Sequence, residues 1–286
     1  MKLVRSVGVV GAGTMGLGIA QVCASAGIDV LLYDINTNQL DKAVQAIGSN
    51  LAEAVSRGRI SDESRIATLS RIRKTHDLNF MVTDIVIEAA VERLDIKQTL
   101  LVQLEKVNEG KAILATNTSS ISVSEIAARL RDPSSCIGLH FFNPADRMKL
   151  VEIISTKDTK AEYTQAISDF AKKIGKVAVY AKDSPGFIVN RVARHYYVES
   201  LKLIESHAAR VEAVDALMRA SGFRMGPFEL MDLIGIDTNL AVTTSVYEGF
   251  GKAHKFTPSR TQQQLVARGD LGRKTGKGFY EYNQQK

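Results

Sequence analysis

Three glycines near the N-terminus constrain the fold of this chain more than any other feature. Gly11, Gly13 and Gly16 form the pattern G-x-G-x-x-G within VGVVGAGTMGLGIA, directly after an apolar run and directly before an apolar, helix-forming stretch. In a strand–turn–helix unit, the first glycine permits the tight turn, the second lets a pyrophosphate approach the backbone, and the third lets the helix pack on the strand. The free backbone amides and positive dipole of the helix N-terminus favour an anion. The pattern, with Thr14 and Met15 inside it, therefore predicts a dinucleotide site.

Asp34 indicates which dinucleotide this loop holds. It ends the apolar run DVLLYD, roughly 20 residues after the glycines, where a carboxylate can accept hydrogen bonds from a ribose. The same negative charge repels the 2′-phosphate of NADP. We therefore predict NAD as the cofactor, with FAD and S-adenosylmethionine as alternative occupants of such a loop.

The rest of the chain separates into two regions. Up to Lys182, short apolar runs alternate with amphipathic helical stretches, which is the pattern of a parallel sheet covered on both faces. The expected strands are VGVV, DVLLYD, DIVIEAA, AILATN, CIGLHFF, LVEII and VAVYAK. After Pro185 and Gly186 the remaining sequence is typical of helices. We predict an α/β, Rossmann-type, doubly wound and mostly parallel sheet in residues 1–183, followed by an all-helical domain in residues 184–286.

Composition restricts the class of protein. The net charge of +6 comes from scattered basic residues, which argues against a nucleic-acid surface and suits attraction of anionic small molecules. The two cysteines, Cys23 and Cys136, form neither a disulfide framework nor a metal-ligand pattern, so we expect no metal and a reducing, cytoplasmic location. No segment resembles a secretory signal or a membrane-spanning helix.

Polar residues follow several of the expected strands, where ligands bind in a parallel sheet. Asn117, Ser119 and His140 occupy such positions, and Glu152 lies on the next apolar run, far enough along for the chain to turn back beside His140. A histidine oriented by a carboxylate is a general base for an alcohol proton. Taken alone, His140 would more often be a hydrogen-bonded core histidine, and Glu152 a solvated strand residue. Together with the nucleotide loop, the pair predicts dehydrogenation of an alcohol.

A set of motifs extends these observations along the chain. In order, GAGTMGLGIA, ATNTSS, GLHFFNP, MKLVEII, SPGFIVNR, MGPFEL and GRKTGKGFYEY closely resemble the short-chain L-3-hydroxyacyl-CoA dehydrogenase family, which includes 3-hydroxybutyryl-CoA dehydrogenases. This resemblance implies reversible NAD-dependent oxidation of a (3S)-3-hydroxyacyl-CoA in fatty acid metabolism. It also implies a helical C-terminal domain that contributes to the substrate site and forms a homodimer.

The resemblance also implies roles for individual residues. His140 corresponds to the catalytic base and Glu152 to its orienting partner, while Ser119 and Asn190 correspond to groups that bind the substrate oxygens. The further cofactor positions are Glu92, Lys97, Asn117, Ser119, Asn143 and Lys274. Asn50 and Arg57 fall where relatives contact coenzyme A, although some of those relatives carry serine in place of Asn50.

Two features leave the acyl group open. Asp146 and Arg147 replace a pair that is often small, apolar and proline in the family, and SGFRMGPFELMDLIG resembles the branch that acts on 3-hydroxyadipyl-CoA in phenylacetate breakdown. A dicarboxylic acyl group needs a cationic partner, for which Arg147, Arg194 and Arg224 are candidates. Two alternatives are a non-catalytic NAD-binding module, which needs no His–Glu pair, and a methyltransferase, which has no use for one.

Overall fold

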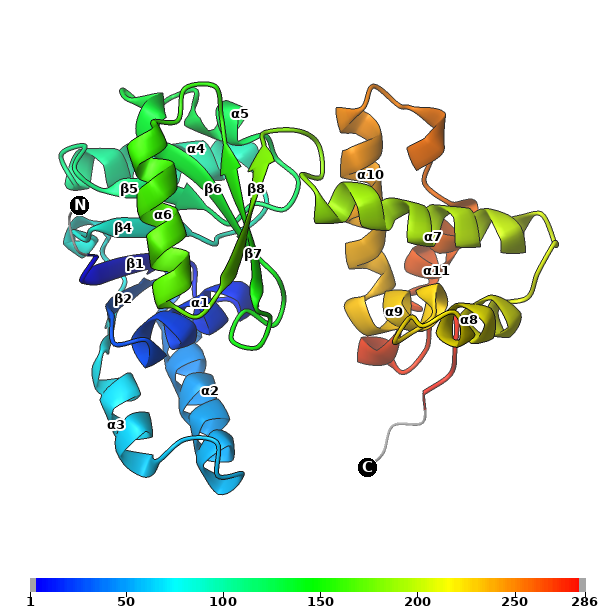
Figure 1. Ribbon diagram of the computed structural model, residues 1–286, viewed down its shortest axis with the longest axis horizontal. Coiled ribbons are helices and arrows are strands. Elements are labelled where there is room, and N and C mark those ends of the chain that lie inside the picture. Colours follow the sequence, from blue (N-terminus) through cyan, green and yellow to red (C-terminus); the bar gives the residue numbers. More distant parts are fainter. Residues whose placement is uncertain (1–3, 283–286) are drawn as a thin grey trace. The chain divides into compact units, whose positions relative to one another are not determined.

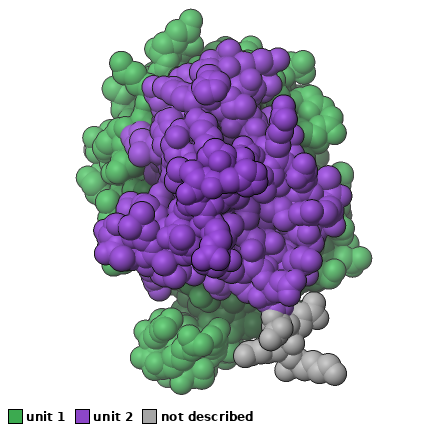
Figure 2. Space-filling view, turned by 90° about the vertical axis from the view of Figure 1, so that its right-hand side faces the viewer, with its two compact units in different colours: residues 1–184 green, residues 185–286 purple. Residues whose placement is uncertain are grey.

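The computed structural model describes residues 4–282 of the chain. The chain divides into two compact units, residues 1–184 and residues 185–286, which are coloured separately in Figure 2. Each unit has its own hydrophobic core. Among the described residues, no helix is both long and apolar enough to cross a membrane.

An eight-stranded sheet forms the middle of the first unit (Figure 1). Its strands are β1 (Ser6–Val10), β2 (Asp29–Tyr33), β3 (Ile72–Thr75), β4 (Ile85–Glu88), β5 (Ile113–Thr116), β6 (Cys136–Phe141), β7 (Leu150–Ser155) and β8 (Val177–Lys182). The strands lie in the order β3-β2-β1-β4-β5-β6-β7-β8, and each neighbouring pair is parallel except β6 and β7. The predicted Rossmann-type, mostly parallel sheet is confirmed.

The strand β3 is absent from the sequence-based set of strands. Its sequence, IRKT, has a single apolar residue, and the side chains of Arg73 and Lys74 are exposed. Because β3 lies at the edge of the sheet and pairs with β2, it is held by ladder hydrogen bonds without the apolar run that marks a buried strand.

Helices cover both faces of this sheet. They are α1 (Thr14–Ser25), α2 (Thr37–Ser56), α3 (Asp62–Ser70), α4 (Leu94–Val107), α5 (Val123–Ala127) and α6 (Ala161–Lys173), with 3-10 turns η1 (Leu78–Phe80) and η2 (Pro133–Ser135). In Figure 1, α6 lies in front of the sheet and α4 behind it. Ile19 and Cys23 of α1 share one core cluster with Ile167 and Phe170 of α6. Burial of this shared apolar surface holds the two helices on the sheet.

Local sequence signals set the ends of two of these helices. At the start of α2, the Asn36 side chain accepts a hydrogen bond from Asn38 N–H, a capping role for which asparagine is well suited. Beyond α6, Gly175 has φ 72°, a left-handed conformation that costs glycine little and ends the helix. The sequence indicates both boundaries.

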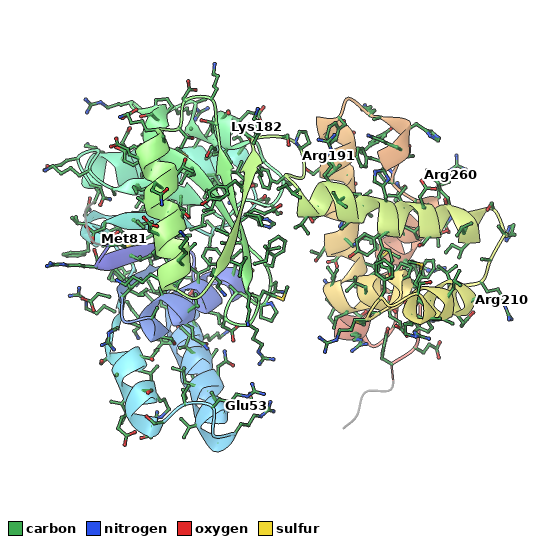
Figure 3. All side chains as sticks on the ribbon, viewed as in Figure 1. Glu53, Met81, Lys182, Arg191, Arg210 and Arg260 are labelled. Carbon is green, nitrogen blue, oxygen red and sulfur yellow. The ribbon has the colours of Figure 1, made fainter. Side chains whose placement is uncertain are left out.

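The second unit is built from helices. They are α7 (Val189–Glu205), α8 (Val211–Ala220), α9 (Pro227–Ile234), α10 (Ile236–Gly249) and α11 (Arg260–Arg268), with 3-10 turns η3 (His254–Phe256) and η4 (Arg273–Thr275). Its core joins Tyr197 and Leu201 of α7 to Phe228 and Met231 of α9. In Figure 3, the labels Arg191 and Arg210 mark the first turn of α7 and the residue before α8. The helical character predicted for this part of the chain is confirmed.

Candidate active site

The glycine loop between β1 and α1 has the geometry that a pyrophosphate requires. A Cβ on Gly16 would lie 1.7 Å from the Gly11 carbonyl oxygen, and a Cβ on Gly11 would lie 2.6 Å from the Ala89 oxygen, so both positions exclude side chains. A Cβ on Gly13 would meet nothing within 4 Å and would occupy the open space above the loop. Helix α1 begins at Thr14 without a side-chain cap or an acidic residue in its first turn. These features fit an anionic ligand at the helix N-terminus.

Asp34 lies directly beside this loop. Its Oδ2 accepts a hydrogen bond from Ala12 N–H at 2.8 Å, and its Oδ1 accepts one from Asn36 N–H at 2.9 Å. The Gln39 side chain donates to the Ala12 carbonyl at 3.0 Å. The carboxylate therefore supports the loop through the backbone of Ala12.

A histidine and a glutamate lie opposite each other on the antiparallel strands β6 and β7. The ladder pairs His140 directly with Glu152, and His140 Nδ1 lies 2.7 Å from Glu152 Oε2. Glu152 is completely buried and His140 is 6% exposed. Because β1, β4, β5 and β6 are parallel neighbours, their carboxyl ends lie along one side of the sheet. His140 and the glycine loop both lie on that side. The carboxylate fixes which imidazole nitrogen faces it.

The loop that follows β5 carries Asn117 and Ser119. Asn117 Oδ1 accepts a hydrogen bond from Phe141 N–H at 2.8 Å, which joins this loop to the end of β6. Ser119 donates its backbone N–H to Glu92 Oε1 at 3.0 Å. At the far end of the loop, Asp183 accepts hydrogen bonds from the backbone amides of Val123 and Ser124. The loop is thus held at both ends by carboxylates from other parts of the first unit.

The loop after β6 contains Asn143, whose peptide bond to Pro144 is cis. Lys176, 6% exposed, donates from Nζ to the carbonyls of Ala145 and Met148, each at 2.6 Å. These bonds tie the loop to the residue before β8. The next residues, Asp146 and Arg147, form an ion pair at 3.7 Å, and the Arg147 side chain is 67% exposed.

The remaining predicted site residues lie on other elements. Asn50 on α2 donates to the Gln21 side chain at 3.2 Å, and Arg57 at the end of α2 pairs with Glu53, which is labelled in Figure 3. Two further residues belong to the second unit. Asn190 lies in the first turn of α7, and Lys274 in η4 pairs with Asp237 at 2.6 Å.

Two residues of this site were missed by the sequence analysis. Glu88 ends β4 with a completely buried carboxylate, which accepts from Lys97 Nζ at 2.8 Å and from Thr116 Oγ1 at 2.7 Å. Asp183 follows β8 directly. Both stand at the end of an expected strand, the position that singled out Asn117 and His140, so the same criterion applied to acidic residues would have found them.

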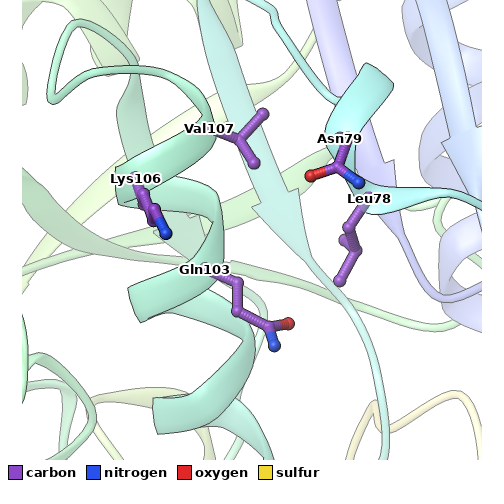
Figure 4. Close-up of a pocket in the computed structure, with 5 residues that line it drawn as sticks. All are labelled: Leu78, Asn79, Gln103, Lys106 and Val107. Carbon is purple, nitrogen blue, oxygen red and sulfur yellow. The ribbon is translucent and has the colours of Figure 1, made fainter.

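A surface cavity of about 460 Å³ lies away from this edge of the sheet (Figure 4). Leu78 and Asn79 of η1, which precede β4, line it together with Gln103, Lys106 and Val107 at the end of α4. It is therefore near the amino end of β4, whereas ligands of parallel sheets bind at carboxyl ends. The candidate active site is the edge that carries the glycine loop and His140.

Comparison with known proteins agrees with this geometry. The family model described as "3-hydroxyacyl-CoA dehydrogenase, NAD binding domain" matches residues 6–184, and the model of the C-terminal domain of that family matches residues 186–282. A 3-hydroxyadipyl-CoA dehydrogenase of Escherichia coli is 46% identical over 99% of this chain, which spans 60% of the length of that relative. A 3-hydroxybutyryl-CoA dehydrogenase of Bradyrhizobium diazoefficiens is 39% identical over 98% of this chain and 96% of its own length.

A solved structure of a 3-hydroxyacyl-CoA dehydrogenase is also similar to this chain over its whole length. The structure of (S)-3-hydroxybutyryl-CoA dehydrogenase from Ralstonia eutropha matches with a TM-score of 0.94 at 38% identity, covering 99% of this chain and 100% of that one. The Rossmann-type unit and its matched domain define an NAD-binding oxidoreductase. More specifically, the chain belongs to the 3-hydroxyacyl-CoA dehydrogenase family. The predicted family, enzyme class and cofactor are confirmed.

Proposed function

We propose that this protein oxidises a (3S)-3-hydroxyacyl-CoA to the 3-oxoacyl-CoA with NAD, and catalyses the reverse reaction, with 3-hydroxybutyryl-CoA as its substrate. The observation that carries this proposal is the His140–Glu152 pair, which lies at the same edge of the sheet as the glycine loop. A module that only binds NAD needs no buried base at the carboxyl ends of the strands, where the glycine loop lies.

The chemistry follows from the geometry of the pair. Since Glu152 contacts Nδ1 of His140, we assign the proton transfer to Nε2. Nε2 takes the proton of the C3 hydroxyl, and Glu152 stabilises the resulting imidazolium. NAD, when bound, supplies the acceptor for the hydride that leaves C3. In the reverse direction, the imidazolium returns its proton to the C3 oxygen.

Other residues bind and orient the reactants in this proposal. Ser119 and Asn190 hold the substrate oxygens, and Asn50 and Arg57 contact coenzyme A. The cofactor is bound by Gly11, Gly13, Thr14, Met15, Gly16, Asp34, Glu92, Asn117, Ser119, Asn143 and Lys274. The open space above Gly13 and the carboxylate of Asp34 support the cofactor assignments most directly.

A second candidate substrate is 3-hydroxyadipyl-CoA, which is favoured by the name of the Escherichia coli relative and by Arg147. Of the three candidate arginines, Arg194 is 3% exposed and donates to the Asn239 carbonyl and the Thr243 hydroxyl, so its guanidinium is already used inside the second unit. Arg224 is exposed in the second unit. Arg147 is exposed and lies in the loop that follows β6, the strand that carries His140.

The substrate test compares kcat/KM for 3-hydroxybutyryl-CoA and 3-hydroxyadipyl-CoA. The proposal predicts a preference for the butyryl substrate. A strong preference for the adipyl substrate, lost in Arg147→Met and retained in the matched control Lys149→Met, would instead support the second candidate. Lys149 is an exposed cation two residues away, so it controls for the general loss of positive charge.

We further propose that the protein is a cytoplasmic homodimer. Large apolar side chains are exposed on the second unit, including Leu217, Phe223, Leu233 and Ile234. Cys23 and Cys136 are buried free thiols, which suits a reducing compartment. Sedimentation equilibrium tests the assembly. A monomer mass at micromolar concentration would contradict the dimer.

A further inference from the structure

A buried lysine holds the loop that joins β6 to β7. Lys176 lies directly before β8 and is 6% exposed. Its Nζ donates to the carbonyl oxygens of Ala145 and Met148, each at 2.6 Å. Burial lowers the pKa of this ammonium, and the nearby charge of Asp146 acts against that shift. Because burying an ammonium is costly unless it is hydrogen-bonded, both carbonyls are held beside Nζ.

Within the loop, the chain turns back on itself. The Pro144 carbonyl accepts hydrogen bonds from Arg147 N–H at 3.1 Å and from Met148 N–H at 2.9 Å. The carbonyls of Ala145 and Met148, which belong to the same turn, both bind the Lys176 ammonium. Hydrogen bonds from a charged donor are stronger than those between neutral groups. Lys176 therefore fixes this turn from outside, at two points of its backbone.

The side chain of Ala145 packs against α1. Ala145 is 1% exposed, and a Cβ on Gly18 of α1 would lie 3.1 Å from the Ala145 Cβ. This apolar contact brings the loop close to α1, but it is not directional and does not by itself fix the orientation of the backbone. The hydrogen bonds from Lys176 supply that direction, so the loop is held between α1 and Lys176.

The first residue of this loop contacts the proposed base. Phe142 directly follows β6, and the centroid of its ring lies 4.6 Å from that of the His140 ring, at an interplanar angle of 54°. The contact with Glu152 fixes one atom of the imidazole, Nδ1. The contact with Phe142 limits rotation of the ring about that atom. Since the rate of proton transfer depends on the orientation of the base, the position of Phe142 matters for the reaction.

We propose that Lys176 is a positioning residue for His140, and that it acts by holding the loop of residues 142–149 so that Phe142 stays against the imidazole. This inference rests on the proposed function for the role of His140, but the placement of the loop by Lys176 does not depend on that role. A purely structural role for Lys176 would instead lower stability without a selective loss of the chemical step.

The first test uses Lys176→Met, which keeps a long unbranched side chain and removes the ammonium. Amide hydrogen exchange of residues 142–149 is compared in the wild type and the variant. We expect faster exchange in Lys176→Met, because two loop carbonyls lose their donor. Unchanged exchange would overturn the proposal, whatever the protein catalyses. If Lys176→Met does not fold, Lys176→Gln, a shorter neutral side chain that retains N–H donors, is compared in its place with the same two outcomes.

The single-turnover rate of NADH oxidation by saturating acetoacetyl-CoA is the second readout. We expect Lys176→Met to lower this rate about tenfold and to change KM by less than about threefold, because the loop orients the base. In a Phe142→Leu background, the same replacement should lower the rate by less than about twofold, since the two residues act in series. Equal, multiplying losses in both backgrounds would overturn the proposed action through Phe142. A higher KM with an unchanged rate would overturn it as well.

Ser168→Ala is the matched control. Ser168 is 1% exposed, and its Oγ lies 2.6 Å from the Tyr180 hydroxyl, so the variant removes a hydrogen bond between α6 and β8 and leaves the two Lys176 contacts in place. We expect it to lower Tm while leaving the single-turnover rate and the exchange of residues 142–149 unchanged. If it reproduces the effects of Lys176→Met, these effects reflect general loss of packing and the proposal fails. An inactive wild type would refute the proposed function, and the exchange experiment would still decide whether Lys176 holds the loop.

Discussion

The two units both bury charged side chains, but they satisfy them in different ways. In the first unit, the two completely buried carboxylates, Glu88 and Glu152, contact Lys97 and His140, side chains that can carry a proton. In the second unit, Asp215 accepts from the backbone amides of Phe228 and Glu229 and from the Tyr280 hydroxyl. The first arrangement can position or move a proton, whereas the second holds the chain together.

Arg194 and Asp232 extend this contrast. Asp232 accepts from the amides of Phe279 and Tyr280 and from the Tyr282 hydroxyl, which fastens the segment after η4 to α9. Burial lowers the pKa of Arg194 to about 10, and its guanidinium donates to a carbonyl and a hydroxyl. A buried charge is therefore evidence for catalysis only when its partner is titratable and lies at the ligand-binding edge of the sheet.

The largest effect is expected at His140. Replacement His140→Gln removes the base and should lower kcat for acetoacetyl-CoA reduction by about 10³-fold, within the usual range for general acid–base catalysis. The Kd for NADH, measured by fluorescence titration, should change little because the residue acts on the substrate hydroxyl. A rate within a few-fold of the wild type would remove His140 from the mechanism.

A smaller loss of kcat is expected when Glu152, the partner of His140, is replaced. Glu152→Gln keeps the size of the side chain but removes the charge that stabilises the imidazolium, and should lower kcat by about 10²-fold. The double variant with His140→Gln should be no slower than His140→Gln alone, because Glu152 acts through the imidazole. A further large loss in the double variant would give Glu152 a separate role.

Asp34 should affect cofactor choice more than rate. Asp34→Asn keeps an acceptor for Ala12 N–H and removes the charge, so NADH affinity should fall about tenfold, the loss expected for one charged hydrogen bond. NADPH affinity should fall less or improve, since the repulsion of its 2′-phosphate is relieved. Kd values for both nucleotides check this, and an unchanged ratio would contradict the assignment.

Replacement of a buried carboxylate in the second unit should change the stability of the protein but not its catalytic rate. Asp215→Asn weakens the hydrogen bonds to the first turn of α9 and to Tyr280, and should lower the free energy of unfolding by about 2 kcal/mol. The kcat measured below the unfolding transition should stay unchanged. Urea denaturation measures the free energy of unfolding, and steady-state rates measure kcat. A loss of kcat without a loss of stability would contradict the proposed difference between the two units.

Much of the first unit was predictable because its signals are local. The glycine loop, Asp34 and the buried strands are visible as short patterns, and the twelve-residue separation of His140 and Glu152 corresponds to the antiparallel turn between β6 and β7. The edge strand β3 was missed because its two central residues, Arg73 and Lys74, are charged.

The parts that could not be predicted depend on distant partners. Asp215 accepts from amides 13 and 14 residues away and from a tyrosine 65 residues away, and none of these partners has a sequence pattern that points to it. The partners of Glu88 present the same difficulty, because Lys97 of α4 and Thr116 of β5 lie on other elements, although the position of Glu88 near the end of a strand is visible in the sequence. Such networks follow from packing across elements, which local propensity does not encode.

The most direct test of the central claim is the oxidation of NADH by the wild-type protein in the presence of acetoacetyl-CoA, followed by the loss of NADH absorbance. The account predicts rapid oxidation that requires the thioester and is much slower with NADPH. Measurable NADH binding without oxidation, for acetoacetyl-CoA and for 3-oxoadipyl-CoA alike, would contradict the account and identify the chain as a binding module.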